Sequence, residues 1–373
     1  MAIHIKKDLN IDRFQLIFME KVCIFCGQRP YNKTKEHVIP KWLIELTGSP
    51  KRYGFFGYYN EDKGPKEMHL SFNDFTFPAC EKCNKTYSDL EAKTKPVILE
   101  LLDEKPLDGK DINIILTWFD KVRIGLWLGS LYYNNILGIN PNFYIDQGTF
   151  SRDRMVLIYK NKPIKKRLNF IGVYHAFQMH PICFTLIINN FAFTNVAKNL
   201  LLSENFGLAV LQEDIIFKRG GAGIIKKGSQ KISYPLVDFN FEKNCTEFYQ
   251  PNLSDYYSKQ IFSMINDEHR EKIFISKSSK IGNIFYHRDG SLIKYPTKKN
   301  RSWVPPSFDL PFLEFFRIIG MQSLQIQNHY FKKKSIIFDP KLSSEFKKQQ
   351  QFALKYNNIL LERLEKRDFE EFG

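Results

Sequence analysis

Cys23-Ile24-Phe25-Cys26 and Cys80-Glu81-Lys82-Cys83, two copies of the spacing Cys-x-x-Cys, decide the fold of the N-terminal part of this chain. Each pair can form a tight turn that presents two thiolates to one ion, and two such turns complete the tetrahedral four-cysteine site of structural zinc. Gly27 follows the first pair, where this turn often needs a positive φ. The alternatives are two redox-active dithiols or four buried cysteines. A redox motif would be a single pair in a β-α-β unit, so the sequence predicts a structural Zn²⁺ that closes the long loop between the pairs.

A second group of polar residues lies between and directly after these pairs. Lys35-Glu36-His37-Val38-Ile39-Pro40 precedes the second pair, and Asn84 follows Cys83. An imidazole can take a proton from water near neutral pH, and carboxylate and amide oxygens are the ligands that Mg²⁺ or Mn²⁺ prefers. Hydrolysis of a phosphodiester needs both a base and a cation of this kind. His37 could instead be a zinc ligand or a core histidine, but four cysteines already satisfy a zinc ion.

With these motifs, residues 20–95 resemble the HNH (ββα-metal) endonuclease family, over about a quarter of the chain. The resemblance implies a β-hairpin followed by a helix, held together by zinc on the four cysteines. It implies that His37 is the general base, and that Glu36 and Asn84 are ligands of a catalytic Mg²⁺ or Mn²⁺. Two departures concern the metal geometry, because Glu36 stands where the family more often has Asp and Asn84 where it often has His.

The middle Asn of the family motif fixes the imidazole and is expected on the second strand, before the second cysteine pair. Asn73 is the candidate for it, and Asp74 is the second choice. His69 is a weaker site candidate. Glu91, one helical stretch past the second pair, either supports the site or has a surface or capping role.

The resemblance implies a metal-dependent endonuclease that hydrolyses phosphodiester bonds of DNA, with RNA as an open alternative. By analogy alone, such a chain would act as a restriction or anti-phage defence effector. Two other hypotheses stay open: a non-catalytic zinc-dependent nucleic-acid-binding protein, and a nuclease gated by a ligand or partner on the C-terminal region. A homodimer is expected if both DNA strands are cut, because that takes two active sites or two visits.

The charge balance also favours a polyanionic partner. Lys and Arg number 55 against 40 Asp and Glu, which gives a formal net charge of +15. Aromatic residues Tyr295 and Trp303 lie among one basic cluster and could stack on bases. The alternative for each cluster is a solvated loop. The clusters are Lys160, Lys162, Lys165, Lys166 and Arg167; Lys226, Lys227 and Lys231; Lys294, Lys298, Lys299 and Arg301; and Lys332, Lys333 and Lys334.

The chain is expected to have an α+β fold with two domains: residues 1–105 as the HNH nuclease domain with structural zinc, and 106–373 as an unrecognised α+β domain. The second domain should hold an antiparallel sheet with flanking helices. Helices are predicted at Asp111–Asn135 and about Ser343–Phe369, with an apolar segment at Leu310–Met321. Strands are predicted at Met155–Tyr159, Phe170–Tyr174, Cys183–Ile188, Phe206–Leu211 and Ile273–Ile275.

No apolar run approaches the roughly 18 to 20 residues of a membrane span, and the N-terminus lacks a signal-peptide layout. We therefore expect a cytoplasmic protein without a membrane partner, in which the cysteines stay reduced. Cys183 and Cys245 are expected to be core thiols rather than ligands. Gly220–Gly223 lacks the Gly-Lys-Ser/Thr ending of a phosphate-binding loop, so it is interpreted as a turn.

Overall fold

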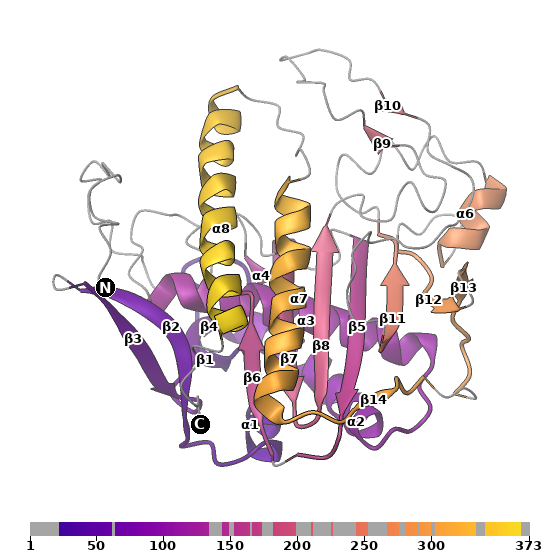
Figure 1. The fold of residues 1–373 in the computed structure, drawn as a ribbon, viewed down its shortest axis with the longest axis horizontal. Helices are drawn as coiled ribbons and strands as arrows, with labels where there is room; N and C mark the ends of the chain where they lie inside the picture. Colours follow the sequence, from indigo (N-terminus) through magenta and orange to yellow (C-terminus); the bar gives the residue numbers. More distant parts are fainter. Residues whose placement is uncertain are drawn as a thin grey trace.

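A mainly antiparallel sheet of eight strands organises the fold (Figure 1). The computed structural model describes residues 22–61, 64–133, 144–148, 153–164, 166–173, 182–198, 210–211, 225–226, 244–252, 267–275, 281–288, 291–299, 303–332 and 340–366. The strands follow the spatial order β13-β12-β11-β5-β8-β7-β6, and β14 pairs with β5 in parallel. Their bounds are β5 Asp153–Asn161, β6 Leu168–Ile171, β7 Cys183–Ile188, β8 Phe191–Lys198, β11 Cys245–Gln250, β12 Phe285–Arg288, β13 Ser291–Lys294 and β14 Ser307–Phe308.

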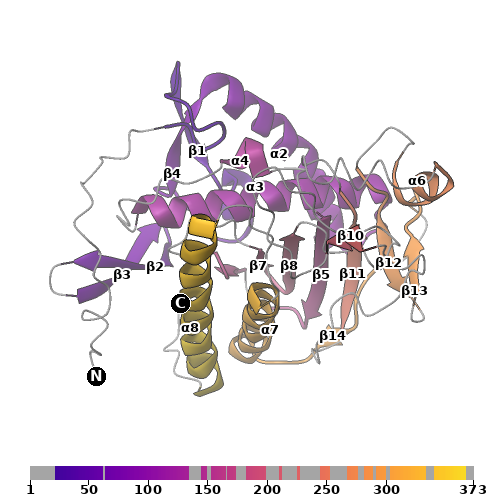
Figure 2. The same ribbon diagram turned by 90° about the horizontal axis from the view of Figure 1, so that it is seen from above.

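Helices cover both faces of this sheet (Figure 2). The three long ones beside it are α3 (Gly109–Tyr133), α7 (Phe312–Lys332) and α8 (Pro340–Lys366). Alternate residues of β5 point to opposite faces, so Val156 and Ile158 pack in the core under α3 while Met155 and Leu157 pack in the core under α7. This two-sided burial explains why β5 is a continuous apolar run, and it confirms the α+β class with an antiparallel sheet.

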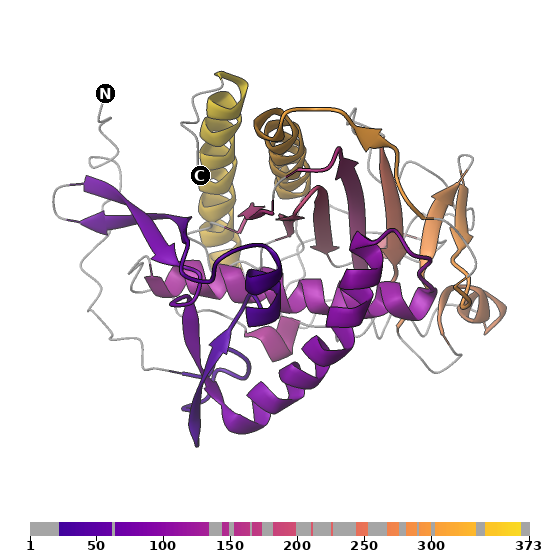
Figure 3. The same cartoon turned by 90° about the horizontal axis from the view of Figure 1, so that it is seen from below.

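The N-terminal part packs on the other side of α3 (Figure 3). Its elements are β1 (Lys33–His37), α1 (Lys41–Leu46), β2 (Tyr53–Glu61), β3 (Gly64–Ser71), β4 (Thr76–Cys80) and α2 (Glu81–Leu102). Strands β1 and β4 pair antiparallel, with His37 opposite Thr76, and α2 begins directly after β4. One buried apolar cluster contains Phe25 of this part, Trp118 of α3 and Phe193 of the sheet. The core is therefore continuous across residue 105.

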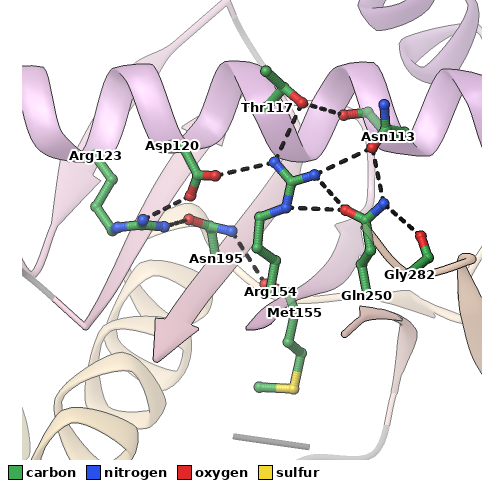
Figure 4. Close-up of polar contacts among 9 residues, drawn as sticks. All are labelled: Asn113, Thr117, Asp120, Arg123, Arg154, Met155, Asn195, Gln250 and Gly282. Atoms are coloured by element: carbon green, nitrogen blue, oxygen red, sulfur yellow. Dashed lines mark hydrogen bonds and ion pairs between the residues drawn. The ribbon is translucent and has the colours of Figure 1, made fainter. Parts of the chain in front are cut away.

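A buried polar network fixes α3 on the sheet (Figure 4). Asp120 of α3 bonds Arg123 at 2.6 Å and Arg154 of β5 at 3.0 Å. Arg154 Nε also donates to Gln250 Oε1 of β11 at 3.0 Å, and Arg123 donates to Asn195 of β8. Because a misplaced helix would leave these charged groups unpaired in the core, the network sets the position of α3.

Helix α3 approaches the N-terminal part closely where it carries glycine. A Cβ atom on Gly125 would lie 2.6 Å from Cγ1 and 2.9 Å from Cγ2 of Val38, a buried β-branched residue next to His37. We predict that Gly125→Ala lowers the free energy of unfolding by about 1–3 kcal/mol, since this overpacking outweighs the gain in helix propensity of about 1 kcal/mol. Urea denaturation of the two proteins measures the difference.

Gly320 of α7 provides the matched control. A Cβ there would lie 3.2 Å from the terminal Cδ1 of Ile171, and the next atoms are farther away, at 3.6 Å on Leu364. Gly320→Ala should therefore be neutral or stabilising. Equal effects of the two substitutions would show that α3 does not hold Val38 tightly.

Several predicted elements are confirmed. The helix predicted at Asp111–Asn135 is α3, and the C-terminal helix is α8. The apolar segment at Leu310–Met321 comprises Leu310 and Pro311 and then the first half of α7, which begins at Phe312. The strand predicted at Cys183–Ile188 is β7, and the one at Met155–Tyr159 is the core of β5. The strand predicted at Phe170–Tyr174 is β6, which begins two residues earlier and ends at Ile171.

The strand predicted at Ile273–Ile275 is wrong. Ile273 ends α6 (Asp267–Ile273), whose Glu268 and Lys272 form an ion pair of 2.8 Å at helical spacing, and Phe274 makes only an isolated bridge. Of Phe206–Leu211, the described residues are the strand β9 (Val210–Leu211), which pairs with β10 (Ile225–Lys226). Gly220–Gly223 lies outside the described residues. Among the helices that the structure describes, none has the length and apolar composition that crossing a membrane requires.

Candidate functional site

Four cysteine thiols converge beside β4, as the spacing predicts. The sulfur atoms of Cys23, Cys26, Cys80 and Cys83 all lie within 4.8 Å of one another, and Cys26 Sγ is 3.9 Å from Cys80 Sγ. Zinc–sulfur bonds of about 2.3 Å put the sulfurs of a tetrahedral site about 3.8 Å apart. The residues therefore fit a metal ion such as zinc.

The two cysteine pairs are held in different ways. The first pair sits in a turn closed by Gly27 N, which donates to Cys23 O at 2.8 Å, and Gly27 has φ +74°, the left-handed conformation expected for it. In the second pair, Cys80 is the N-cap of α2 and Cys83 lies in the first turn. The positive end of the helix dipole thus faces the cluster, which favours thiolates.

The pKa shifts of the cysteine thiols favour the binding of a cation. Burial, together with the hydrogen bond and the charge of the neighbouring Cys23, raises the pKa of Cys80 to about 11. Burial and the neighbouring thiols also raise the pKa of Cys83. A bound divalent ion reverses this, because it holds coordinating thiols in the deprotonated form.

The other two cysteines belong to the sheet. Cys183 is fully buried, and burial raises its pKa to about 12. Its Sγ lies 3.6 Å from Ser323 Oγ of α7. Cys183 belongs to the apolar cluster between the sheet and α7, and Cys245 packs at the edge of that cluster. Cys183 is therefore a core thiol, as expected, whereas Cys245 is only partly buried.

His37 is the last residue of β1 and is partly exposed. Its Nε2 lies 3.1 Å from the main-chain carbonyl oxygen of Asn73. A carbonyl oxygen only accepts, so Nε2 carries the proton and Nδ1 of the neutral ring is left as a base. The strand ends here because the chain turns into α1, for which Pro40 is the N-cap.

Asn73 therefore meets His37, but through its backbone and not from a strand. It lies in the turn between β3 and β4, where its own N–H donates to Pro50 O at 3.1 Å. The side chains of Asn73 and Asp74 are both exposed. The expected position on the second strand is wrong, since β4 begins only at Thr76. His69 is exposed on β3, opposite Phe55.

Asn84 lies in the first turn of α2 and ties this helix to β1. Its Nδ2 donates to Thr34 Oγ1 at 3.0 Å and to Lys35 O at 3.5 Å. Side chains at alternate positions of β1 share a face, so Thr34 and Glu36 point toward α2 and α3 while Lys35 and His37 point the other way. The amide of Asn84 therefore forms its hydrogen bonds to β1 on the face of the strand that carries Glu36.

Glu36 is buried and forms an ion pair of 2.5 Å with Lys121 of α3. The Lys121 ammonium also contacts Glu91, the residue for which a supporting role was one hypothesis. Burial alone would lower the pKa of Lys121, but the two carboxylates outweigh burial and raise it. Burial raises the pKa of Glu91, and Lys121 opposes that rise. Lys121 is a residue that sequence reasoning missed; its one signal is a charge inside the apolar run of α3.

The described geometry gives no support to a catalytic divalent ion at Glu36 and Asn84. Glu36 is 6 % exposed and already contacts a cation that the chain supplies. Apart from the four cysteines, no three Cys, His, Asp or Glu side chains in the described part of the chain lie close enough together to hold a metal. The role of Glu36 and Asn84 as ligands of Mg²⁺ or Mn²⁺ therefore stays a prediction without structural support.

Part of the expected basic surface is used within the chain. Lys160 pairs with Glu104 at 2.6 Å, Lys162 with Asp309 at 2.8 Å and Lys299 with Glu100 at 2.6 Å. The stacking role of Tyr295 and Trp303 is wrong, because both rings are 4 % exposed and their polar atoms bond main-chain oxygens. Lys165, Lys227, Lys231, Arg301, Lys333 and Lys334 lie outside the described residues.

Two other lysines lie next to His37 in the structure. Lys33 and Lys35 are exposed and alternate along β1, so they share its outer face with His37. Their signal in the sequence is this period of two, which becomes visible only when the segment is known to be a strand. They extend a positive strip away from the imidazole.

Comparison with known proteins gave no match: no family model, no curated protein and no solved structure proved similar to the chain.

Proposed function

We propose that this chain is an endonuclease of the HNH kind that hydrolyses phosphodiester bonds of DNA, with His37 as the general base. The observation that carries the proposal is the bond between His37 Nε2 and the Asn73 carbonyl oxygen, 3.1 Å long. It leaves Nδ1 unprotonated on a partly exposed ring. The surrounding unit has two antiparallel strands followed by a helix that starts at the cysteine cluster, which agrees in part with the hairpin and helix that the resemblance implies; α1, β2 and β3 lie between the two strands in place of a hairpin turn.

In the proposed reaction, His37 Nδ1 removes a proton from a water molecule as the water oxygen attacks phosphorus. The new bond joins this oxygen to phosphorus, and the bond from phosphorus to the 3′ oxygen breaks, so the products are a 5′-phosphate and a 3′-hydroxyl. The leaving oxygen takes its proton from solvent. No step is assigned to a divalent ion, because Glu36 Oε1 already contacts the Lys121 ammonium.

Lys33 and Lys35 would hold the phosphate backbone beside the base. Contacts of this kind bind nucleic acid without reading its sequence, in keeping with the net charge of +15. If both strands are cut, either two copies act together or one copy acts twice. A defence role in the cytoplasm rests on analogy alone.

Plasmid cleavage by the full-length, zinc-loaded protein tests the proposal, with Mg²⁺ or Mn²⁺ supplied. His37→Ala should lower the rate by about 10²- to 10⁴-fold, the usual worth of a positioned general base. His69→Ala, the same change at an exposed histidine of β3, should cut at the wild-type rate. Equal cleavage by wild type and a folded His37→Ala variant would disprove the assignment of the base. A single-stranded RNA substrate in parallel separates DNA from RNA as the target.

The burial of Glu36 against Lys121 favours one alternative, a zinc-dependent module that binds nucleic acid without cutting it. In that case wild type would leave plasmid intact yet bind a DNA duplex, with an affinity that falls steeply as salt is added. Lys33→Gln with Lys35→Gln should then weaken binding and flatten the salt dependence. Cleavage by the wild type that is lost in His37→Ala rejects this alternative.

A further inference from the structure

We infer that the ammonium of Lys121 takes the place of the divalent cation that the resemblance assigns to Glu36, and that Lys121 is the positioning residue for His37. The role of His37 in this inference rests on the proposed function. The replacement of a metal by an ammonium does not, since it concerns what Glu36 contacts in the folded chain.

Four oxygen atoms from two segments, residues 36–38 and α2, surround the Lys121 ammonium. Glu36 Oε1 of β1 is 2.5 Å away, and Glu91 Oε1 of α2 is also in contact. The main-chain oxygens of His37 and Val38 each lie 3.3 Å from Nζ. The Lys121 side chain is 0 % exposed, against 8 % for Glu36 and 19 % for Glu91. The carboxylate and carbonyl oxygens around this compact cation are the same kinds of ligand that surround hard metal ions in proteins.

The charges decide which cation the site accepts. Two carboxylates and one ammonium leave the cluster with a single negative charge, and a divalent ion brought in beside Lys121 would meet its positive charge in a site with little solvent. Lys121 would have to leave first, and it would then lose both carboxylates and both carbonyl oxygens. A divalent ion at Glu36 Oε1 would therefore have to displace the Lys121 ammonium.

The same contacts orient the base. Lys121 holds the carbonyl groups of His37 and Val38, and the Asn73 carbonyl holds the imidazole ring from the other end. Backbone and ring are thus fixed by separate partners, at the point where β1 ends. A displacement of about 1 Å in a catalytic group can cost on the order of 100-fold in rate, so this anchoring is part of how the base works.

Manganese binding by the full-length, zinc-loaded chain tests the replacement without any need for activity. We expect that Mn²⁺ leaves the melting temperature of wild type unchanged, and that Glu36→Gln behaves like wild type in this respect. Glu36→Gln should still fold, because it leaves Lys121 paired one to one with Glu91. Binding of Mn²⁺ to wild type, seen by electron paramagnetic resonance and lost in Glu36→Gln, would overturn the inference.

Lys121→Met gives the complementary result. It removes the ammonium and leaves two buried carboxylates facing each other, so the melting temperature should fall by about 5–10 °C. Added Mn²⁺ should then restore part of that loss, whereas Glu100→Gln, which breaks the exposed pair with Lys299, should change little and show no response. A melting temperature of Lys121→Met that equals that of wild type would also count against the inference. If this variant does not fold, the comparison of wild type with Glu36→Gln still decides.

The positioning role has its own readout. In Lys121→Met we expect kcat for plasmid cleavage to fall on the order of 100-fold with little change in KM, and Lys121→Arg to recover part of the loss because it keeps a cation there. A purely structural role would lower the amount of folded enzyme and would leave kcat per folded molecule unchanged. If the wild type does not cleave at all, the proposed function fails while the manganese experiment still stands.

Discussion

Removal of the metal from the four-cysteine cluster is expected to unfold the N-terminal part of the chain. The cluster joins the first cysteine pair to the start of α2, and Phe25 between Cys23 and Cys26 stacks on Tyr87 of that helix at 4.2 Å. Structural zinc contributes about 10–16 kcal/mol in zinc-finger peptides, as much as the whole stability of a domain, about 5–15 kcal/mol. Elemental analysis should find one zinc per chain, and chelation should abolish hydrogen-exchange protection over residues 22–105.

Single cysteine variants provide the control for chelation. Cys80→Ser should lose zinc and reproduce the effect, whereas Cys183→Ser, which changes a buried thiol of the sheet, should keep the full zinc content. The loss should also reach α3, because Phe25 and Trp118 share one core. Protection that survives chelation unchanged would contradict a structural role for the metal.

Local patterns explain what could be predicted from the sequence. The cysteine spacing acts within four residues, and the apolar period of α3 and the continuous apolar run of β5 are properties of single elements. Each pattern has a physical cause that needs no knowledge of the rest of the chain. The cluster of Cys23, Cys26, Cys80 and Cys83 can therefore be predicted from the sequence alone.

Contacts between residues far apart in the chain explain what could not be predicted from the sequence. Lys121 is 84 positions from His37, and no local rule indicates that an ammonium in an apolar helix will meet the end of a particular strand. The same limit produced the error at Tyr295 and Trp303, whose lysine neighbours suggested a surface while their rings fill the core. An aromatic residue that follows lysines in the sequence can lie in an exposed loop or in a buried turn, and the sequence alone does not distinguish the two.

Asp120→Asn is expected to be the most destabilising conservative change in the sheet region. Asp120 is the shared partner of Arg123 and Arg154, and the three side chains are 2 %, 0 % and 1 % exposed (Figure 4). Burial lowers the pKa of Arg154 and Asp120 raises it, so the carboxylate offsets part of the cost of burying this guanidinium. Removing it takes the shared carboxylate away from two buried cations, which should lower the free energy of unfolding by about 3–5 kcal/mol. Urea denaturation of the zinc-loaded chain measures this loss.

Glu268→Gln in α6 is the matched control, because it breaks an exposed ion pair with Lys272 of similar length, 2.8 Å, between side chains that are 78 % and 67 % exposed. That change should cost less than about 0.5 kcal/mol, so the two variants separate burial from mere proximity of charge. A double-mutant cycle of Asp120→Asn with Arg154→Met should give a coupling energy of about 1–3 kcal/mol. Additive effects would mean that the network does not act as a unit. In that case α3, and with it Lys121 and the end of β1, would be held on the sheet by apolar packing alone.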